Sequence, residues 1–382
     1  MDVLRKSVTL GSSGGSNPSF SNNQDIRYIS GYYGAAANDH YYLKNDTATP
    51  WVKLWVDPMV FWPNSTGGPN LTIQGQIDSQ IAYAKSWGLK TILGVLPNWP
   101  AWINGVPGDP VAIPRDVSPT GNWAYFVYYL AARYNPFNPN RPGNGYGWVD
   151  VIEPFNEPNN PTFATRQDDL PERIADMMKA AKQVILSTNN TPVMAGPSLQ
   201  DVERDDATKD FRSFTARVGV QLQSNGFYSL GNNQSFIWSV HNYLDVLYDI
   251  GLTTQYPGVN DGDNTLTRTG QVYDLLRDVA WRGWPDGGLT PFIFATEGGG
   301  VLPNIKSKWS LNDTQALDKQ SVLWQRNWSR MKSATEGRGV ALVSNYNYYA
   351  RTSQPEYDCA LLAAPFQPRP VYTTWKGFAS AS

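Results

Sequence analysis

The chain is poor in the residue types that build disulfide frameworks and metal centres. Its 382 residues include one cysteine, Cys359, so an intrachain disulfide and a multi-cysteine metal site are both excluded. Only two histidines occur, His40 and His241, which rules out a histidine-rich metal centre. We therefore expect no metal ion and no other cofactor.

An excess of one charge and long apolar runs are also missing. The formal net charge is −2, and no run of lysine or arginine occurs, whereas a nucleic-acid-binding protein usually shows a basic excess. No stretch of about 18 apolar residues is present, so no membrane span is expected. Residues 1–24 are polar and lack the apolar core of a signal peptide. The chain is thus that of a cytoplasmic protein, or of an exported one without its signal. We expect a monomer in a secreted or periplasmic location.

Aromatic residues are abundant, with 15 Trp, 21 Tyr and 14 Phe. Two interpretations remain open. In the first, the rings serve a large core and the packing between helices. In the second, they line a groove, because flat rings meet the apolar C–H faces of sugars at little entropic cost.

Eight apolar segments typical of strands alternate with segments of helical periodicity. The strands are expected at 26–34, 51–62, 90–99, 148–158, 192–199, 236–243, 291–300 and 339–349. The helices are expected at 73–88, 122–134, 171–188, 208–223, 266–282, 314–331 and 371–380. Such alternation predicts a parallel sheet, and eight units favour closure into an α/β fold of the (β/α)8 TIM barrel type.

No Pro/Gly/Ser-rich linker divides the chain after residue 25. We therefore expect a polar N-terminal lead-in over 1–25 and a single barrel over 26–382. A doubly wound open sheet is the main alternative. It would carry a glycine-rich phosphate turn after the first strand, and the sequence GYYGAAAND at 31–39 is a weak version of one.

Two glutamates stand at expected strand ends, Glu157 after the fourth strand and Glu297 after the seventh. In a barrel these ends converge on one site. Two carboxyl groups across a sugar-sized gap can hydrolyse a glycosidic bond. One protonates the leaving oxygen, and the other attacks the anomeric carbon or activates water. The alternative is a pair of structural acids.

A third acid, Glu153, precedes Glu157 by four residues and would lie on the same side of an extended strand, one layer deeper. A buried carboxylate needs a partner, and Lys53 on the second strand is the candidate. This favours a structural role for Glu153. Asp57 is either a substrate ligand or a loop cap, and the sequence does not separate the two.

Four segments resemble clan A glycoside hydrolases, which are retaining enzymes built on (β/α)8 barrels. The segment FNEPNN at 155–160 resembles their Asn-Glu-Pro motif, and FIFATEGGG at 292–300 resembles their strand-seven nucleophile segment. WSVHNY at 238–243 resembles the His-x-Tyr of families five and thirty-nine. PFQPRPVYTTWKGF at 365–378 is similar to the closing stretch of such barrels. The resemblance covers the chain from about residue 25.

The resemblance implies a role for five residues. Glu157 would be the general acid/base and Glu297 the nucleophile, while Asn156 would bind the sugar 2-hydroxyl. Tyr243 would donate a hydrogen bond to Glu297, and His241 would bind the substrate or the acid network. The implied activity is a retaining hydrolase of O-glycosidic bonds, of β configuration, in oligo- or polysaccharides. The alternatives are a transglycosidase and a catalytically inactive glycan-binding barrel.

The sequence departs from the family pattern at three places. Lys53 is the nearest match to the strand-two arginine, and Asn98-Trp99 replaces the strand-three histidine. Tyrosines such as Tyr348 stand where the eighth strand usually ends in tryptophan. We expect Lys53, Asn98, Trp99 and Tyr348, together with Trp102, to take part in substrate binding.

Overall fold

The fold is described from a computed structural model. It describes residues 21–25, 44–45, 47, 49–165, 167–189, 192–230, 237–248, 267–279, 292–333, 337, 339–346, 348, 350, 355–364 and 367–379. The chain divides into two compact units, which we describe separately. Unit 1 comprises Met1–Val52, Val240–Asp274 and Phe292–Ser382, and unit 2 comprises Lys53–Ser239 and Leu275–Pro291.

The fold is a (β/α)8 barrel, as the sequence predicts, with the strand order β1 to β8. The strands are β1 (Ser21–Asp25), β2 (Trp51–Val56), β3 (Lys90–Val95), β4 (Val151–Glu153), β5 (Val193–Gln200), β6 (Ile237–His241), β7 (Phe292–Glu297) and β8 (Val340–Asn345). A separate two-stranded sheet pairs β9 (Leu362–Ala364) with β10 (Gln367–Pro368).

The first strand differs from the expected one. Residues 26–34 lie outside the described residues, and β1 comes from the segment expected to be a lead-in. It pairs in parallel with β8, with Asn22 opposite Val343. Pairing uses backbone groups only, so a polar segment can form a strand without the apolar pattern that sequence reading looks for. The division into a lead-in of 1–25 and a barrel of 26–382 stays a prediction.

The helices follow the predicted alternation. They are α3 (Pro58–Phe61), α4 (Leu71–Ser86), α5 (Ala101–Asn104), α6 (Asn122–Arg133), α7 (Leu170–Leu186), α8 (Phe211–Ser224), α9 (Tyr243–Leu247), α10 (Arg268–Val279), α11 (Leu302–Trp309), α12 (Asp313–Lys332) and α13 (Pro370–Ala379), with 3₁₀ turns at Gly143–Gly145, Phe227–Ser229 and Pro355–Tyr357. The short α3, α5 and α9 follow β2, β3 and β6 directly. They occupy loops on the side where such a barrel builds its site.

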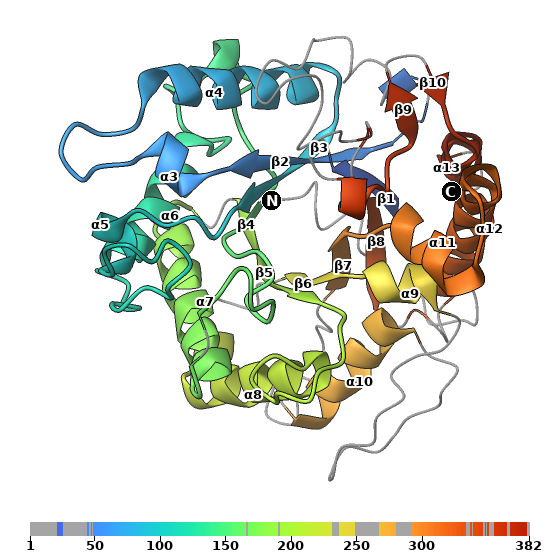
Figure 1. Ribbon diagram of the computed structural model, residues 1–382. Coiled ribbons are helices and arrows are strands. Elements are labelled where there is room, and N and C mark those ends of the chain that lie inside the picture. Colours follow the sequence, from blue (N-terminus) through green and yellow to red (C-terminus); the bar gives the residue numbers. More distant parts are fainter. Residues whose placement is uncertain are drawn as a thin grey trace. The chain divides into compact units, whose positions relative to one another are not determined.

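In unit 2, the parallel strands β3, β4 and β5 lie side by side, and α6, α7 and α8 lie outside them (Figure 1). Ile152 of β4 pairs with Leu93 of β3 on one side and with Met194 of β5 on the other. Beyond β4, Phe155 stacks on Trp123 of α6 with 5.4 Å between ring centroids. This stacking places the residue before Asn156 in the core.

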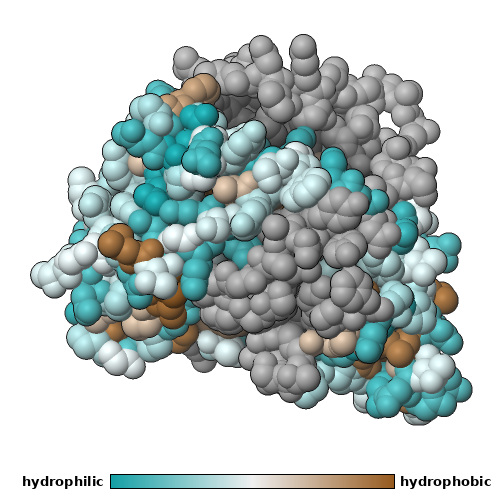
Figure 2. All heavy atoms as spheres, turned by 90° about the horizontal axis from the view of Figure 1, so that it is seen from above, coloured by the Kyte–Doolittle hydropathy of each residue, from teal (hydrophilic) through white to brown (hydrophobic). Residues whose placement is uncertain are grey.

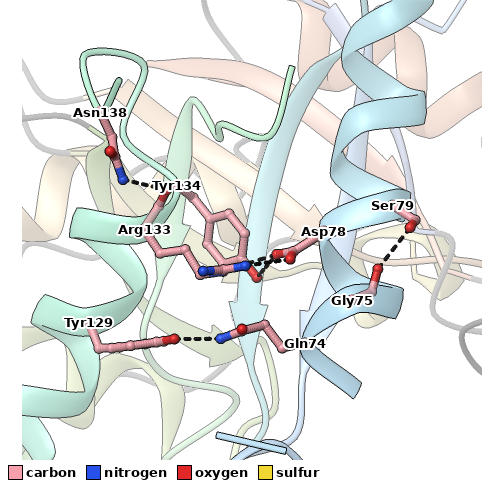
Figure 3. Close-up of polar contacts among 8 residues, drawn as sticks. All are labelled: Gln74, Gly75, Asp78, Ser79, Tyr129, Arg133, Tyr134 and Asn138. Atoms are coloured by element: carbon pink, nitrogen blue, oxygen red, sulfur yellow. Dashed lines mark hydrogen bonds and ion pairs between the residues drawn. The ribbon is translucent and has the colours of Figure 1, made fainter. Parts of the chain in front are cut away.

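Helices α4 and α6 are joined by a polar cluster (Figure 3). Asp78 of α4 accepts from the Arg133 guanidinium, with Nη2–Oδ2 at 2.5 Å, and from the Tyr134 hydroxyl at 2.9 Å. Burial, with the Asp78 charge as a second cause, raises the pKa of Tyr134 well above its ordinary value. The phenol therefore acts as a neutral donor that fixes α4 against α6.

In unit 1, β8 lies between β1 and β7, and α12 and α13 lie side by side (Figure 1). Tryptophans fill the contact between these helices. Trp328 stacks on Phe378 with centroids 4.2 Å apart, and Trp324 meets Trp375 edge-on at 5.0 Å. Helix α13, which is formed by the closing stretch that resembles the family, thus packs against α12.

The surface drawn in colour in Figure 2 is mostly hydrophilic or neutral, and hydrophobic residues appear on it in small separate groups. Within the described residues, no helix has both the length and the apolar character that a membrane span requires.

Candidate active site

Beneath the end of β4, Glu153 forms the ion pair that the sequence predicts. Its Oε2 pairs with Lys53 Nζ, and both side chains are completely shielded from solvent. Ser198 Oγ donates to the other carboxylate oxygen at 2.5 Å, and it also contacts Ser239 Oγ at 2.9 Å. Glu153 is therefore a structural acid whose charge is compensated inside the core.

Lys53, which the sequence also predicts to bind substrate, has a fully buried side chain, and its contact with substrate stays a prediction. Its ammonium group is committed to Glu153 and lies 4.1 Å from the centroid of the Trp55 ring. Gly94 makes room for both side chains, since a Cβ there would lie 2.9 Å from Lys53 Cε and from Trp55. The burial of Lys53 and its ion pair with Glu153 give it a structural role in the core.

Glu157 does not continue the strand as an extended residue. β4 ends at Glu153, and Glu157 has a φ of +46°, in the left-handed region. For a residue with a side chain this conformation costs roughly 1–2 kcal/mol. Two backbone hydrogen bonds hold it: Glu157 N–H donates to Ser198 O at 3.0 Å, and Asn160 N–H donates to Glu157 O at 2.8 Å. The simple alternation that places Glu153 and Glu157 on one side of a straight strand therefore fails here.

The turn after Glu157 is held by side chains that the sequence reading passed over. Asn159 is buried and bridges to β5, donating to Gln200 O at 2.8 Å and accepting from Gln200 N–H at 2.9 Å. The buried Lys209 donates to Pro158 O at 3.2 Å and to Ala164 O at 2.9 Å. In the sequence, this turn is indicated by Asn159 and by the proline and asparagines of FNEPNN, which are residue types that favour turns.

Asn160 contacts the candidate acid directly. Its Nδ2 donates to Glu157 Oε2 at 2.8 Å, and its Oδ1 accepts from Thr162 N–H at 3.0 Å. The sequence reading did not single out Asn160.

Asn156 lies beside Glu157 and is 2% exposed. Within the described residues, no group hydrogen-bonds to its Oδ1. A buried carboxamide oxygen without a protein partner is costly unless a ligand or water satisfies it. This is the behaviour expected of a substrate-binding amide, although the role itself stays a prediction.

Asp57 is a loop cap, which resolves the alternative that the sequence left open. It is the N-cap of α3, accepting from Met59 N–H at 2.9 Å and from Val60 N–H at 3.4 Å. Asn98 Nδ2 donates to both carboxylate oxygens at 3.0 Å. Burial raises the pKa of Asp57, and these donors act in the opposite direction. Asn98 therefore has a structural contact that competes with its expected contact to substrate.

The tryptophans after β3 divide into buried and half-buried ones. Trp99 is 3% exposed, and its ring packs edge-on against Phe126 at 6.3 Å. Trp102 of α5 is half-buried, donates from Nε1 to Trp62 O at 2.8 Å, and lies 5.0 Å from the Trp62 ring. Of the two expected sugar platforms, Trp102 keeps an accessible ring, whereas Trp99 packs in the core.

In unit 1, Glu297 is the last residue of β7 and meets the His-x-Tyr segment at the end of β6. The Tyr243 hydroxyl donates to Glu297 Oε1 at 2.5 Å, as expected from the resemblance. His241 is fully buried, with Nδ1 3.9 Å from Glu297 Oε2, which is beyond hydrogen-bond distance. Asn242 N–H donates to Glu297 O at 2.9 Å and ties the two strand ends together.

The backbone after Glu297 is shaped by two glycines. A Cβ at Gly298 would lie 1.9 Å from Asn242 Oδ1, and one at Gly299, where φ is +155°, would lie 2.7 Å from Cys359 Cβ. Cys359 is fully buried, and burial raises the pKa of its thiol. Gly298 and Gly299 are therefore required by the close packing of the backbone that follows Glu297.

Tyr348, the residue expected near the end of the eighth strand, is 2% exposed, and its carbonyl accepts from Leu362 N–H at 3.0 Å. Its contact with substrate stays a prediction. The neighbouring Asn347 and Tyr349 lie outside the described residues.

No family model and no curated protein matches the sequence. Solved structures do match. A family 39 glycoside hydrolase from the gut symbiont Bacteroides cellulosilyticus WH2 has a TM-score of 0.60 at 14% identity, covering 94% of this chain and 63% of that one. A GH5_18 structure from Streptomyces cattleya in complex with GlcNAc has a TM-score of 0.63 at 14% identity, covering 96% and 80%.

The endo-β-1,4-glucanase from Xanthomonas axonopodis pv. citri has a TM-score of 0.53 at 14% identity, covering 95% of this chain and 99% of that one. The chain spans less than two thirds of the family 39 structure. Likeness at this identity concerns the fold. It confirms the (β/α)8 barrel, and the solved structures that match include glycoside hydrolases of families 5 and 39.

Proposed function

We propose that this protein is a retaining glycoside hydrolase that cleaves O-glycosidic bonds, of β configuration, in oligo- or polysaccharides. The observation that carries the proposal is the hydrogen bond from Tyr243 to Glu297 at the end of β7. A hydroxyl that donates to a carboxylate favours its ionised form, which is the form a nucleophile needs. The likeness to solved glycoside hydrolases supports the same reading.

The second carboxyl group comes from Glu157. In the strand order of a (β/α)8 barrel, the carboxyl ends of the fourth and seventh strands open on the same face. Glu157 follows β4, and Glu297 ends β7. We take these two acids as the catalytic pair on that topological ground.

In the first step, Glu297 attacks the anomeric carbon and the bond to the leaving oxygen breaks. The proton of Glu157 passes to that oxygen, so the first product leaves as a neutral alcohol. In the second step, Glu157 takes a proton from water, the hydroxide oxygen bonds to the anomeric carbon, and Glu297 is released. The configuration at that carbon is retained because it is inverted twice.

Asn156 would bind the 2-hydroxyl of the reactive sugar through the carboxamide whose oxygen lacks a protein partner within the described residues. That contact strengthens as charge develops on the ring in the transition state. His241 would bind substrate or the acid network. The expected secreted location and monomeric state stay predictions.

The proposal is tested by the variants Glu157→Gln and Glu297→Gln, assayed on a panel of aryl β-glycosides and polysaccharides. Each is expected to lower kcat/KM by about 10³-fold or more while the thermal unfolding midpoint stays close to that of the parent. Parent-level turnover by Glu297→Gln would refute the nucleophile assignment. A crystal structure should place the two carboxyl groups about 5–5.5 Å apart, whereas a separation above about 6.5 Å would indicate an inverting enzyme.

A further inference from the structure

Tyr243, whose hydroxyl donates to Glu297, is the first residue of α9, a helix of only five residues. The preceding residue, Asn242, makes no side-chain cap to this helix, and the Tyr243 side chain is half-buried. A phenol hydroxyl lies at the far end of a ring that turns about two bonds. A short, uncapped helix therefore does not by itself fix the direction of the hydroxyl, and other side chains must hold the ring.

Tyr346 supplies such a contact. It directly follows β8, and its ring meets the Tyr243 ring edge-on, with 6.0 Å between centroids and 75° between planes. Two aromatic rings prefer this arrangement because the positive edge of one meets the negative face of the other. Tyr346 also forms a buried apolar cluster with Val301 and Cys359, and Tyr243 packs against that cluster. The Tyr243 ring thus has a buried surface to pack on, while its hydroxyl reaches Glu297.

Tyr346 is itself held in place through its backbone. Its N–H donates to Gly298 O at 2.6 Å, and its carbonyl accepts from Asn345 Nδ2 at 3.2 Å. Because Gly298 directly follows Glu297, Tyr346 is bound to the backbone beside the carboxylate. Its ring also packs on Tyr243, which donates to that carboxylate. One residue thus contacts both sides of the hydrogen bond between Tyr243 and Glu297.

The cluster around the Tyr346 ring is close-packed. Its third member, Cys359, is fully buried, and a Cβ at Gly299 would lie 2.7 Å from Cys359 Cβ. The Tyr346 side chain is 5% exposed. In such packing, a change in one side chain is felt by its neighbours. Removal of the Tyr346 ring should therefore allow the Tyr243 ring to turn.

We propose that Tyr346 is a positioning residue for the nucleophile: its ring holds Tyr243 in the orientation in which the Tyr243 hydroxyl donates to Glu297 Oε1. This inference rests on the proposed function. A hydrogen bond weakens steeply when donor and acceptor are misaligned, so a tyrosine that turns away no longer supports the carboxylate. Tyr346 thus acts through Tyr243, and its effect on catalysis should disappear when the Tyr243 hydroxyl is absent.

A double-mutant cycle tests this dependence. The parent, Tyr346→Leu, Tyr243→Phe and the double variant are compared by kcat/KM on the aryl β-glycoside that the parent hydrolyses best. We expect Tyr346→Leu to lower kcat/KM roughly 5- to 50-fold in the parent, but less than about twofold in the Tyr243→Phe background. Losses that multiply would show that Tyr346 acts independently, for example by contact with substrate, and would overturn the proposal.

Two further variants separate positioning from stability. Tyr346→Phe keeps the ring, so its kcat/KM should lie within about threefold of the parent. A loss as large as that of Tyr346→Leu would contradict the role of the ring. Phe378→Leu is the matched control, because Phe378 is also 5% exposed in the same unit and stacks on Trp328.

Phe378→Leu should lower the thermal unfolding midpoint as Tyr346→Leu does, with kcat/KM within about twofold of the parent. If its kcat/KM falls as far as that of Tyr346→Leu, loss of any buried ring impairs activity, and the positioning role is wrong.

Glu297→Gln, measured on the same substrate, distinguishes the inference from the function on which it rests. If Glu297→Gln keeps parent turnover, the proposed function itself fails. If Glu297→Gln is inactive and Tyr346→Leu matches the parent, only the role of Tyr346 fails.

Discussion

Lys53 and Glu153 form an ion pair in which neither side chain has any exposed surface. Removing one partner leaves a buried charge without compensation, which typically costs 3–5 kcal/mol. We expect Lys53→Met to lower the free energy of unfolding by about that amount, measured by denaturant titration. The double variant Lys53→Met/Glu153→Leu should recover much of the loss, since it buries no charge.

The matched control is the exposed pair of Lys306 with Asp313, whose side chains are 43% and 84% exposed. Lys306→Met should change the free energy of unfolding by less than about 0.5 kcal/mol, because water screens such pairs. Equal losses for Lys53→Met and Lys306→Met would contradict the structural role of the buried pair.

Tyr243→Phe removes the hydroxyl that donates to Glu297 and little else. A hydrogen bond to a charged group contributes about 1.5–3 kcal/mol. We therefore expect kcat/KM to fall roughly 10- to 100-fold, with the unfolding midpoint nearly unchanged. The matched control is Tyr128→Phe, at a tyrosine that is 40% exposed on α6, and it should match the parent. A Tyr243→Phe enzyme with full activity would remove the main support for Glu297 as nucleophile.

Trp102 is the candidate ring for a sugar beyond the reactive one. Trp102→Ala should raise KM for an oligosaccharide roughly 5- to 50-fold while kcat on a small aryl glycoside stays within about twofold, since a ring that stacks on a sugar contributes about 1–2 kcal/mol. Trp87→Ala truncates a tryptophan that is 38% exposed at the end of α4, and it serves as the control. An unchanged KM in Trp102→Ala would exclude the platform.

Because Lys182 on α7 is buried, we expect the free energy of unfolding to depend on pH. Burial lowers its pKa to about 8, below the ordinary value of 10.5. The unfolded chain then holds more protons than the folded one between these values, so stability rises as pH increases from about 8 to 10.5. Lys182→Met should stabilise the protein at pH 7 by about 1–3 kcal/mol, and the gain should shrink towards pH 10.5.

Lys179→Met, one turn earlier on the same helix, is the control for the loss of a lysine, and denaturant titrations at pH 7 and pH 10 provide the measurement. A gain in Lys182→Met that grows with pH would have the wrong sign. It would show that the ammonium group is better solvated in the fold than its burial implies.

Much of the fold could be predicted from local pattern. The helix at 122–134 is observed at Asn122–Arg133, and the strand at 291–300 at Phe292–Glu297. Strong apolar periodicity carries this information because the same periodicity decides which face is buried. β1 was missed, because Ser21–Asp25 pairs through its backbone and has no apolar signature.

The sequence by itself determined which residue types could carry chemistry. The strand ends carry two glutamates, an asparagine and a His-x-Tyr segment, which are residue types that can take part in catalysis. The pairing of Lys53 with Glu153 followed from the cost of burying a lone charge. Which side chains contact one another was decided only by the tertiary structure. It buried Lys53 against Glu153, made Asp57 a cap, packed Trp99 in the core and turned Asn160 towards Glu157. The physical reason is that a left-handed turn at Glu157, held by groups about 40 to 50 residues away, leaves no periodic trace in the local sequence.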